Sequence, residues 1–285
     1  MIVNKLREQF FKVWYWYISS VDKNADIIFM NYGYSNNMKV DLNAKDEKNR
    51  YSIQLYHHTV SSVDLSGKHV LEVGCGRGGG LSYINRYLKP ETCTGIDLNN
   101  KAIRFCNKHY KENNISFVQG DAQNLPFEAN SFDVVVNVES SHRYPENELF
   151  FSEVYRVLKP GGHFLFTDFR DDNKVGELDS QLNNCNLFAE SKNDITEYVL
   201  EALTIATPER ENLIKKIAPK LLHNLSKKFA ATVGTPTYNK FRTKKFRYLH
   251  YVMRKQEKET GETLFVSPRI RRSYVPAITS LNSSS

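Results

Sequence analysis

Hydrophobic and polar positions follow two different periods in turn between about residues 50 and 170. Short apolar runs rich in β-branched residues are typical of buried strands, and apolar residues three or four positions apart indicate amphipathic helices. The predicted strands cover residues 69–73, 93–98, 115–118, 132–138 and 163–168. The predicted helices cover residues 78–88, 99–112 and 149–158, and an earlier helix contains His57 and His58. Strands that alternate with helices in this way build a parallel sheet covered by helices.

The pattern after residue 170 is less regular. Thr207-Pro208-Glu209 combines an N-cap residue, a proline at the first helical position and an acid in the first turn. It therefore predicts that a helix begins here and runs towards Phe229. Residues 246–254 alternate as a late strand would, and we expect that strand to form an antiparallel edge of the sheet.

A glycine-rich loop connects the first predicted strand to the helix that follows it. Gly74, Gly76 and Gly79 fit the spacing G-x-G-x-x-G, and Asp97 follows 18 residues after Gly79. Glycines let the backbone turn sharply and approach a ligand closely, and the helix N-terminus presents free N–H groups to it. An acid at the end of the second strand accepts hydrogen bonds from ribose hydroxyls. These features alone suit a nicotinamide dinucleotide as well as S-adenosylmethionine (SAM).

Four further features favour SAM. Glu72 lies in the first strand two residues before Gly74, where a carboxylate suits the cationic methionine end of SAM and repels a pyrophosphate. Asp121 follows the third strand in the sequence Gly-Asp-Ala and can accept a hydrogen bond from the adenine amine. Asn137 ends the fourth strand at the reaction side, and the Lys-Pro-Gly-Gly turn at residues 159–162 leads into the fifth strand.

Together these features resemble, in order and spacing, the motif set of class I SAM-dependent methyltransferases. The resemblance implies an α/β, Rossmann-like fold with a mainly parallel seven-stranded sheet, helices on both faces and a helical cap. It also implies SAM as the cofactor, bound outside the carboxyl ends of the strands. The residues predicted to bind it are Glu72, Gly74, Cys75, Gly76, Gly78, Asp97, Leu98, Asp121, Ala122, Asn137 and Val138.

The same resemblance suggests three parts of the chain. Residues 1–50 are an aromatic-rich cap segment, and residues 51–255 are the methyltransferase domain. Within that domain, residues 170–230 are expected to be a helical insert that caps the substrate. Residues 256–285 are expected to be a flexible basic tail.

Several segments between residues 10 and 170 carry a closer resemblance. They include Ile28-Phe-Met-Asn-Tyr-Gly-Tyr34, Leu55-Tyr-His-His-Thr59, the glycine loop, Gly95-Ile-Asp-Leu-Asn99 and Asn137-Val-Glu-Ser-Ser-His142. Together they resemble the phthiotriol/phenolphthiotriol dimycocerosates methyltransferases, which methylate a secondary hydroxyl on a long polyketide-derived lipid. The resemblance implies an O-methyltransferase for a lipid or polyketide-like alcohol. The basic C-terminal end has no matching segment, which leaves the acceptor open.

Methyl transfer to an alcohol requires an in-line approach and a base, because an alcohol keeps its proton at neutral pH. His142, directly after the fourth strand, is the candidate base, and a loop histidine that only hydrogen-bonds a neighbour is the alternative. Glu139 is a competing base, an orienting partner for His142, or an acid at a helix start.

Aromatic residues before the first strand are candidates for a lid. Tyr34 and Tyr56 are predicted to fold over SAM or the acceptor, because aromatic rings attract a sulfonium, although plain packing of the cap is the alternative. The apolar stripe at residues 10–17 lines an entrance for a hydrophobic acceptor, packs against the sheet or cap, or lies on a membrane surface.

Charge is distributed unevenly along the chain. The net charge is +7, but residues 215–285 contain sixteen Lys and Arg against three Glu, a charge of +13. Such an end is either a solvated surface with a loose tail or a surface that attracts nucleic acid, anionic lipid or an acidic substrate. Asn137-Val-Glu-Ser does not match the N/D-P-P-Y/F/W signature of nucleic-acid aminomethylation, which disfavours nucleic acid. Peripheral membrane contact through the N-terminal aromatics and this end stays open.

Cysteine and leader patterns limit the remaining classes. The four cysteines have no CxxC spacing and no clustered histidines, so we expect neither disulfides nor a metal site. The start of the chain lacks a signal-peptide pattern, and its most apolar run is too short to span a membrane, which predicts a cytoplasmic protein. A C-methyltransferase of the sterol or quinone type and a non-catalytic SAM-binding protein are kept as rival hypotheses.

Overall fold

The computed structural model describes residue 22, residues 25–36 and residues 40–257. The aromatic stripe at residues 10–17 and nearly all of the predicted basic tail lie outside the described residues. In the described part of the chain, no helix is long and apolar enough to cross a membrane.

A seven-stranded sheet in the order β3-β2-β1-β4-β5-β7-β6 forms the centre of the molecule. The first five strands in this order are parallel, and β7 is antiparallel to both of its neighbours. The strands are β1 (His69–Val73), β2 (Thr92–Asp97), β3 (Ile115–Gln119), β4 (Phe132–Val138), β5 (Leu158–Asp171), β6 (Leu187–Asp194) and β7 (Phe246–Lys255). The predicted mainly parallel, seven-stranded α/β fold is therefore confirmed.

Helices cover both faces of this sheet. One hydrophobic cluster packs α2 (Arg50–Val60), α3 (Gly79–Leu88) and α4 (Asn100–His109) against one face, and includes Val70, Val136 and Leu165 of the sheet. The other cluster packs α5 (Asn147–Val157) and α6 (Val175–Asn184) against the opposite face. Successive residues of a strand point to opposite faces, so the nearly uninterrupted apolar sequence of β4 is required by burial on both sides.

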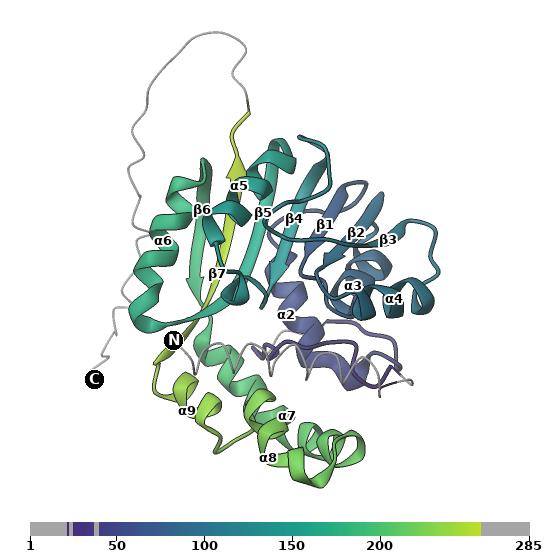
Figure 1. Cartoon of the computed structure of the whole chain (residues 1–285), viewed down its shortest axis with the longest axis vertical. Helices are drawn as coiled ribbons and strands as arrows, with labels where there is room; N and C mark the ends of the chain where they lie inside the picture. The colour runs from purple at the N-terminus through teal and green to yellow at the C-terminus, as the bar shows by residue number, and fades with distance from the viewer. Residues whose placement is uncertain (1–21, 23–24, 37–39, 258–285) are drawn as a thin grey trace, which may run out of the picture.

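A layer of three helices caps one end of the sheet. These are α7 (Thr196–Ile217), α8 (His223–Phe229) and α9 (Pro236–Arg242). Figure 1 shows them beyond the end at which the arrow of β4 terminates, so the cap faces the carboxyl ends of the parallel strands. The short 3-10 helices in the described part of the chain are η1 (Glu47–Asn49), η2 (Ser141–Arg143), η3 (Asp172–Lys174) and η4 (Lys220–Leu222).

Two predictions for the second half of the chain were wrong. Thr207 does not begin a helix, because Pro208 lies inside α7. That helix begins at Thr196, whose N–H donates a hydrogen bond to the Asp194 side chain. Proline removes one backbone donor from a helix, but burial of the α7 face that includes Leu203 holds the helix together across that position. The predicted helix towards Phe229 is accordingly the end of α7 followed by η4 and α8.

The segment at residues 170–230 is also not entirely helical. It contains β6, and this strand rather than β7 forms the edge of the sheet. Most side chains of β6 are exposed and polar, as expected of an edge strand that must not pair with another chain. An edge strand of this kind has little of the apolar alternation by which strands are recognised in a sequence.

A buried ion pair attaches the N-terminal segment to the glycine loop. The Arg77 Nη2 atom donates to the backbone oxygen and to Oδ2 of Asp22, each at 3.0 Å, and the Arg77 side chain has no exposure to solvent. The guanidinium also lies 3.7 Å above the centre of the Phe105 ring. Asp22 in turn accepts hydrogen bonds from the N–H groups of Asp26 and Ile27. Asp22 therefore links Asp26 and Ile27 to the loop through Arg77.

Removal of the carboxylate from this pair should destabilise the protein. We expect Asp22→Asn to lower the free energy of unfolding by about 3 kcal/mol, because Arg77 would keep its buried charge without a counter-charge. Thermal or denaturant unfolding measures the change. Lys192→Met, which breaks the exposed pair with Asp179, is the control and should alter stability little. Equal effects of the two substitutions would contradict the expectation.

Candidate active site

The glycine loop follows β1 and leads directly into α3. Gly74 has a positive φ of 76°, and a Cβ atom there would lie 2.0 Å from Ser140 Oγ, so no other residue fits without displacing the loop after β4. Gly78, which has a positive φ of 74°, is the N-cap of α3. Cys75 is buried, and burial raises the pKa of its thiol well above the ordinary value. The protein itself holds the loop in this shape, because the N–H groups of Gly74 and Cys75 donate to the Ile96 oxygen and that of Gly78 donates to the Cys75 oxygen.

Glu72 is a buried carboxylate directly below this loop. Its Oε1 atom accepts a hydrogen bond of 2.6 Å from the Tyr56 hydroxyl of α2, whereas Oε2 has no partner among the described residues. Burial raises the pKa of Glu72 to about 8. An unpaired buried carboxylate oxygen is costly, which indicates that a ligand with a positive charge or a hydrogen-bond donor completes this site.

Asp97 ends β2 beside the loop. Its Oδ2 atom accepts from the Gly76 N–H at 2.8 Å, and its Oδ1 atom accepts from the Asn99 N–H at 2.8 Å. Burial raises the pKa of Asp97, and these two backbone donors oppose the rise. Leu98 follows and is 63% exposed, so it offers an apolar surface that a flat ring could cover.

Asp121 and Ala122 lie at the same edge because β3 pairs in parallel with β2. The Asp121 side chain is exposed and accepts a hydrogen bond from the Gln123 N–H at 2.9 Å, whereas Ala122 is buried. Register alone therefore brings Asp97, Leu98 and Asp121 to one place.

Asn137 and Val138 end β4 on the other side of β1. The amide nitrogen of Asn137 donates to the backbone oxygen of Val73 at 2.8 Å, and its Oδ1 atom has no partner among the described residues. Val138 is buried in the core that α2 covers. The carboxyl edge of the sheet thus presents a second unpaired oxygen, from Asn137, besides the free oxygen of Glu72. Glu72 pairs in register with Val136, so the Asn137 side chain starts from the opposite face of the sheet, and a ligand would have to reach over the strand ends to meet both oxygens.

His142 lies in η2, directly after β4. Its Nδ1 atom is 2.8 Å from Asp168 Oδ1, and its backbone N–H donates to Asp168 Oδ2 at 2.9 Å. Burial lowers the pKa of His142 below its ordinary 6.5, although the Asp168 carboxylate opposes this. With the Nδ1 proton directed to Asp168, Nε2 is the acceptor of the neutral ring. It accepts a long hydrogen bond of 3.3 Å from Nε of Arg143, which a substrate hydroxyl could replace.

Asp168 was not singled out in the sequence, although it ends the fifth predicted strand beside β4. It is fully buried and also accepts from the Ser141 hydroxyl at 2.7 Å, with Arg170 at 3.1 Å. Burial would raise the pKa of Asp168, but His142 and Arg170 outweigh it and hold the pKa well below its usual range. The signal available in the sequence was that Asp168 ends the fifth predicted strand, while the candidate base His142 follows the fourth.

Glu139 turns towards the cap, and it does not begin a helix. It has a left-handed backbone, with φ of 47°, between β4 and η2. Its Oε1 atom accepts from the Tyr248 hydroxyl at 2.6 Å and from the Tyr32 N–H, whereas the carboxylate that orients His142 is Asp168. Burial raises the pKa of Glu139 to about 8. A non-glycine residue with positive φ is strained, and such strain is often found at functional sites.

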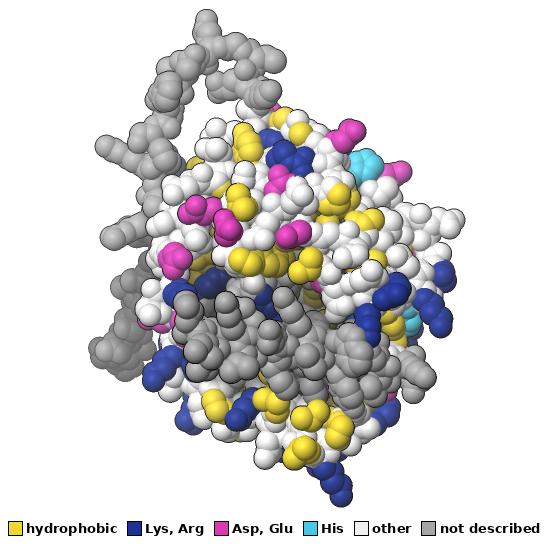
Figure 2. All heavy atoms as spheres, viewed as in Figure 1, with side chains coloured by type: hydrophobic (Ala, Val, Ile, Leu, Met, Phe, Trp, Pro, Cys, Tyr) yellow, Lys and Arg dark blue, Asp and Glu magenta, His cyan; other side chains and the backbone are white. Residues whose placement is uncertain are grey.

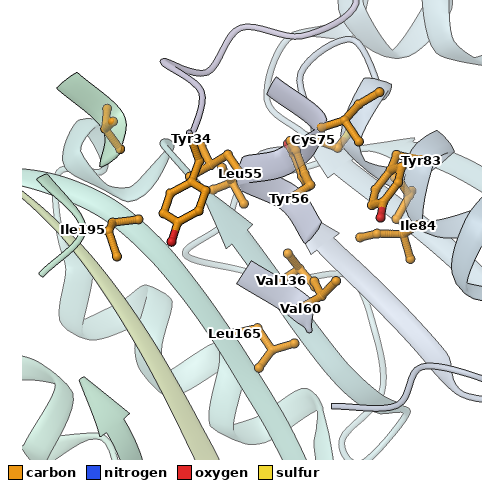
Figure 3. Packing of buried hydrophobic residues seen from close by; sticks show 14 of the residues in the cluster. Tyr34, Leu55, Tyr56, Val60, Cys75, Tyr83, Ile84, Val136, Leu165 and Ile195 are labelled. Atoms are coloured by element: carbon orange, nitrogen blue, oxygen red, sulfur yellow. The ribbon is translucent and has the colours of Figure 1, made fainter. Parts of the chain in front are cut away.

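The two tyrosines predicted to form a lid lie in different places. Tyr56 reaches Glu72, and its ring occupies the space beside Gly80. Tyr34 is buried and stacks on His58, with ring centres 4.3 Å apart. Figure 3 shows Tyr34 beside Leu55 and Ile195, away from Cys75 and Tyr56. The structure therefore brings Tyr56 to the glycine loop and places Tyr34 in the packing between α2 and the cap.

Comparison with known proteins agrees with this geometry. A family model described as a methyltransferase domain matches residues 71–166. A fatty-acid O-methyltransferase of Mycolicibacterium smegmatis is 44% identical over 227 residues, which cover 79% of this chain and 83% of the relative. A phthiotriol/phenolphthiotriol dimycocerosates methyltransferase of Mycobacterium leprae is 42% identical over 229 residues, which cover 79% of this chain and 85% of the relative.

Solved structures share the fold at much lower identity. The [4+2]-cyclase SpnF has a TM-score of 0.66 and 17% identity, with 88% of this chain and 97% of that chain covered. The geranyl diphosphate C-methyltransferase from Streptomyces coelicolor, solved with S-adenosyl-L-homocysteine, has a TM-score of 0.58 and 16% identity, with 79% and 91% covered. At such identities the likeness shows the fold alone.

The glycine loop, the buried acid below it and the sheet order define a class I SAM-dependent methyltransferase, with SAM as its cofactor. Within that class, the chain belongs to the family that contains the phthiotriol/phenolphthiotriol dimycocerosates methyltransferases and the fatty-acid O-methyltransferase. The predictions of class, family and cofactor are confirmed.

The raised pKa of Glu139 predicts a pH-dependent stability. A carboxyl whose pKa is about 8 in the folded state and 4.5 when unfolded stabilises the fold below about pH 4.5 and loses that contribution as pH rises towards 8. Glutamine does not ionise, so Glu139→Gln should not lose stability in this way. Relative to the original protein, the free energy of unfolding of the variant should rise by up to about 1 kcal/mol for each pH unit between pH 6 and 8. Unfolding curves of both proteins across this range measure the difference, and a constant difference would contradict the assignment.

Proposed function

We propose that this enzyme transfers the methyl group of SAM to an oxygen atom of a lipid-like acceptor, and that the oxygen belongs to a hydroxyl group. The single observation that carries the hydroxyl assignment is the His142–Asp168 pair beside the glycine loop. The residues that flank η2 on both sides, Ser140 and Tyr144, are the nearest neighbours of Gly74, so His142 lies within reach of that loop. The named substrates of the relatives, a fatty acid and a phthiotriol lipid, support a hydrophobic acceptor.

SAM supplies an electrophilic methyl group on a sulfonium. In our proposal Glu72 and Asn137 bind the methionine end through their unpaired oxygens. Asp97 accepts from the ribose hydroxyls, and Leu98 and Asp121 contact the adenine. The backbone of the loop, which includes Gly74, Cys75, Gly76 and Gly78, forms the wall of the site, with Ala122 and Val138 behind it. Tyr56 orients Glu72 and lines the sulfonium side, where an aromatic ring is favourable.

His142 is the proposed base. Its Nε2 atom would take the hydroxyl proton as the oxygen–carbon bond forms and the carbon–sulfur bond breaks, with the sulfur leaving as a neutral thioether, and Asp168 would stabilise the imidazolium that results. Glu139 is kept as a competing base, because its raised pKa would let it accept a proton near neutral pH. In this proposal Tyr34, which packs between α2 and the cap, lies on the side of the acceptor and does not contact the cofactor.

A carboxylic acid acceptor is the second candidate, because one relative carries the name of a fatty-acid O-methyltransferase. A carboxylate is already ionised at neutral pH, so its methylation needs alignment but no base. Two rival hypotheses, a C-methyltransferase of the sterol or quinone type and a non-catalytic SAM-binding protein, leave the His142–Asp168 pair without a hydroxyl proton to accept. Contact with a membrane through the N-terminal aromatics and the basic end belongs to the same proposal, since a hydrophobic acceptor partitions into lipid.

Loss of the Glu72 charge should weaken cofactor binding. We expect Glu72→Gln to raise the dissociation constant of SAM by about 10- to 100-fold, the usual effect of one charge-assisted hydrogen bond. Titration calorimetry measures the constant. Because the pKa of Glu72 is about 8 before binding, the original protein should also bind SAM more tightly as pH rises to 8. The variant should lose that part of the pH dependence, and unchanged affinity in Glu72→Gln would refute the assignment.

Removal of the base should affect an alcohol acceptor and spare a carboxylate. We expect His142→Gln to lower kcat for a hydroxylated lipid by about 100-fold or more while SAM affinity stays the same. Asp168→Asn should cause a smaller loss and shift the lower limb of the pH–rate profile to still lower pH, because Asp168 raises the pKa of His142. His163→Gln is the control, because this half-buried histidine lies in the amino-terminal half of β5, opposite Val134.

The acceptor itself is identified by transfer of a labelled methyl group to a panel of hydroxylated lipids, phenols and fatty acids. Turnover of a hydroxyl acceptor that collapses in His142→Gln supports the proposal. Turnover of fatty acids only, with no loss in His142→Gln, would assign the enzyme to carboxylate methylation instead. Binding of SAM without transfer to any acceptor would favour a non-catalytic SAM-binding protein.

A further inference from the structure

The end of the molecule formed by the cap carries an unusual charge. Residues 212–250 contain no Asp or Glu, although they contain ten Lys and Arg. We call the exposed part of this segment the basic cap surface. Its exposed cations are Lys215, Lys216, Lys220, Lys228, Arg242, Lys244 and Lys245.

Several of these cations have no acidic partner in the described part of the chain. Lys216 pairs with Asp26, Lys244 pairs with Glu197 and Lys215 interacts with Glu211, but Lys220 and Lys228 form no ion pair with any described residue. A protein that needed these charges only for internal ion pairs would place acids beside them. Their field is therefore directed outward, towards a negatively charged partner.

Large apolar side chains are exposed among the same charges. Leu221, in η4 between α7 and α8, is 93% exposed, and Val233 and Ile205 are each nearly half exposed. Lys220 precedes Leu221 in the sequence, so an apolar tip and a cation lie side by side. Figure 2 shows hydrophobic side chains gathered at this end of the molecule, over α7 to α9, with Lys and Arg around them.

The cap is attached firmly to the catalytic end of the sheet. Arg210 of α7 donates to the backbone oxygens of Tyr32 and Ala230, at 2.9 and 2.7 Å. Tyr32 donates its N–H to Glu139, so α7 is one hydrogen-bonded residue from the loop after β4. A surface bound through the cap would therefore lie close to the carboxyl edge, where the acceptor must enter.

We propose that the basic cap surface docks on an anionic lipid bilayer, with Leu221 inserted between the headgroups and the cations against them. This inference rests on the proposed function and assigns its membrane contact to one surface of the cap and to an anionic bilayer. Apolar side chains ringed by cations are the usual composition of peripheral membrane contacts. A nucleic-acid site would place exposed aromatic rings between its cations to stack on bases, whereas the large exposed hydrophobic side chains of residues 205–250, Ile205, Leu221 and Val233, are aliphatic.

Vesicle sedimentation of the full chain tests this proposal. The original protein should bind vesicles of phosphatidylglycerol and phosphatidylcholine, bind pure phosphatidylcholine weakly, and be released by salt. We expect Lys220→Glu/Lys228→Glu to lower the partition coefficient at least tenfold, since one cation near an anionic membrane contributes about fivefold. Leu221→Gln should weaken the binding that persists at high salt. Arg104→Glu/Lys108→Glu on the exposed side of α4 has the same change in charge and should bind as the original protein does.

Methyl transfer to a short, water-soluble hydroxyl acceptor is measured in parallel without vesicles. Unchanged turnover in Lys220→Glu/Lys228→Glu, together with lost vesicle binding, supports docking through the cap. Equal vesicle binding by the cap variant and the α4 variant would overturn it, and so would binding to single-stranded DNA in place of vesicles. Failure of methyl transfer in the original protein would instead count against the proposed function, so the two failures are distinguishable.

Discussion

Parallel pairing of β4 between β1 and β5 is the constraint on which the site depends. It brings three acids, Glu72, Glu139 and Asp168, to the carboxyl edge of three neighbouring strands. Burial acts on all three in the same direction, yet their pKa values diverge. Glu72 and Glu139 rise to about 8, whereas Arg170 and His142 hold Asp168 well below its usual range. One edge therefore holds two carboxyls whose pKa burial raises and one whose partners keep its pKa low.

In the proposed function, this divergence suits Asp168 and Glu72 to different tasks. The ionised Asp168 can orient a histidine, because a carboxylate accepts two hydrogen bonds from His142 without donating any. The protonatable Glu72 is matched to a ligand that brings its own positive charge, since such a ligand restores the carboxylate that burial disfavours. In the proposed function, cofactor binding and acid–base chemistry would thus fall to β1 and β5, the two strands that flank β4.

The sequence predicted the parts of the fold that are locally determined. The glycine loop, the end of β2 and the buried run of β4 were each recognisable, because positive φ, strand ends and two-sided burial restrict the residue types allowed there. The edge strand β6 and the start of α7 were missed, since a polar edge has little apolar alternation and Pro208 is an ordinary helix-start residue. Asp168 was missed because its partner lies 26 residues away, and only the register of β4 with β5 brings the two together.

The buried pair between Arg77 and Asp22 has a consequence for the order of events on the enzyme. Arg77 immediately follows Gly76 of the loop, so the loop conformation and the attachment of the N-terminal segment belong to one equilibrium. Linkage between them is reciprocal: whatever tightens the loop on its ligand must tighten the segment by the same factor. Ile28 and Met30 of the same segment lie against Gly79 and Gly76, so a molecule that displaced the segment would weaken ligand binding at the loop from outside it.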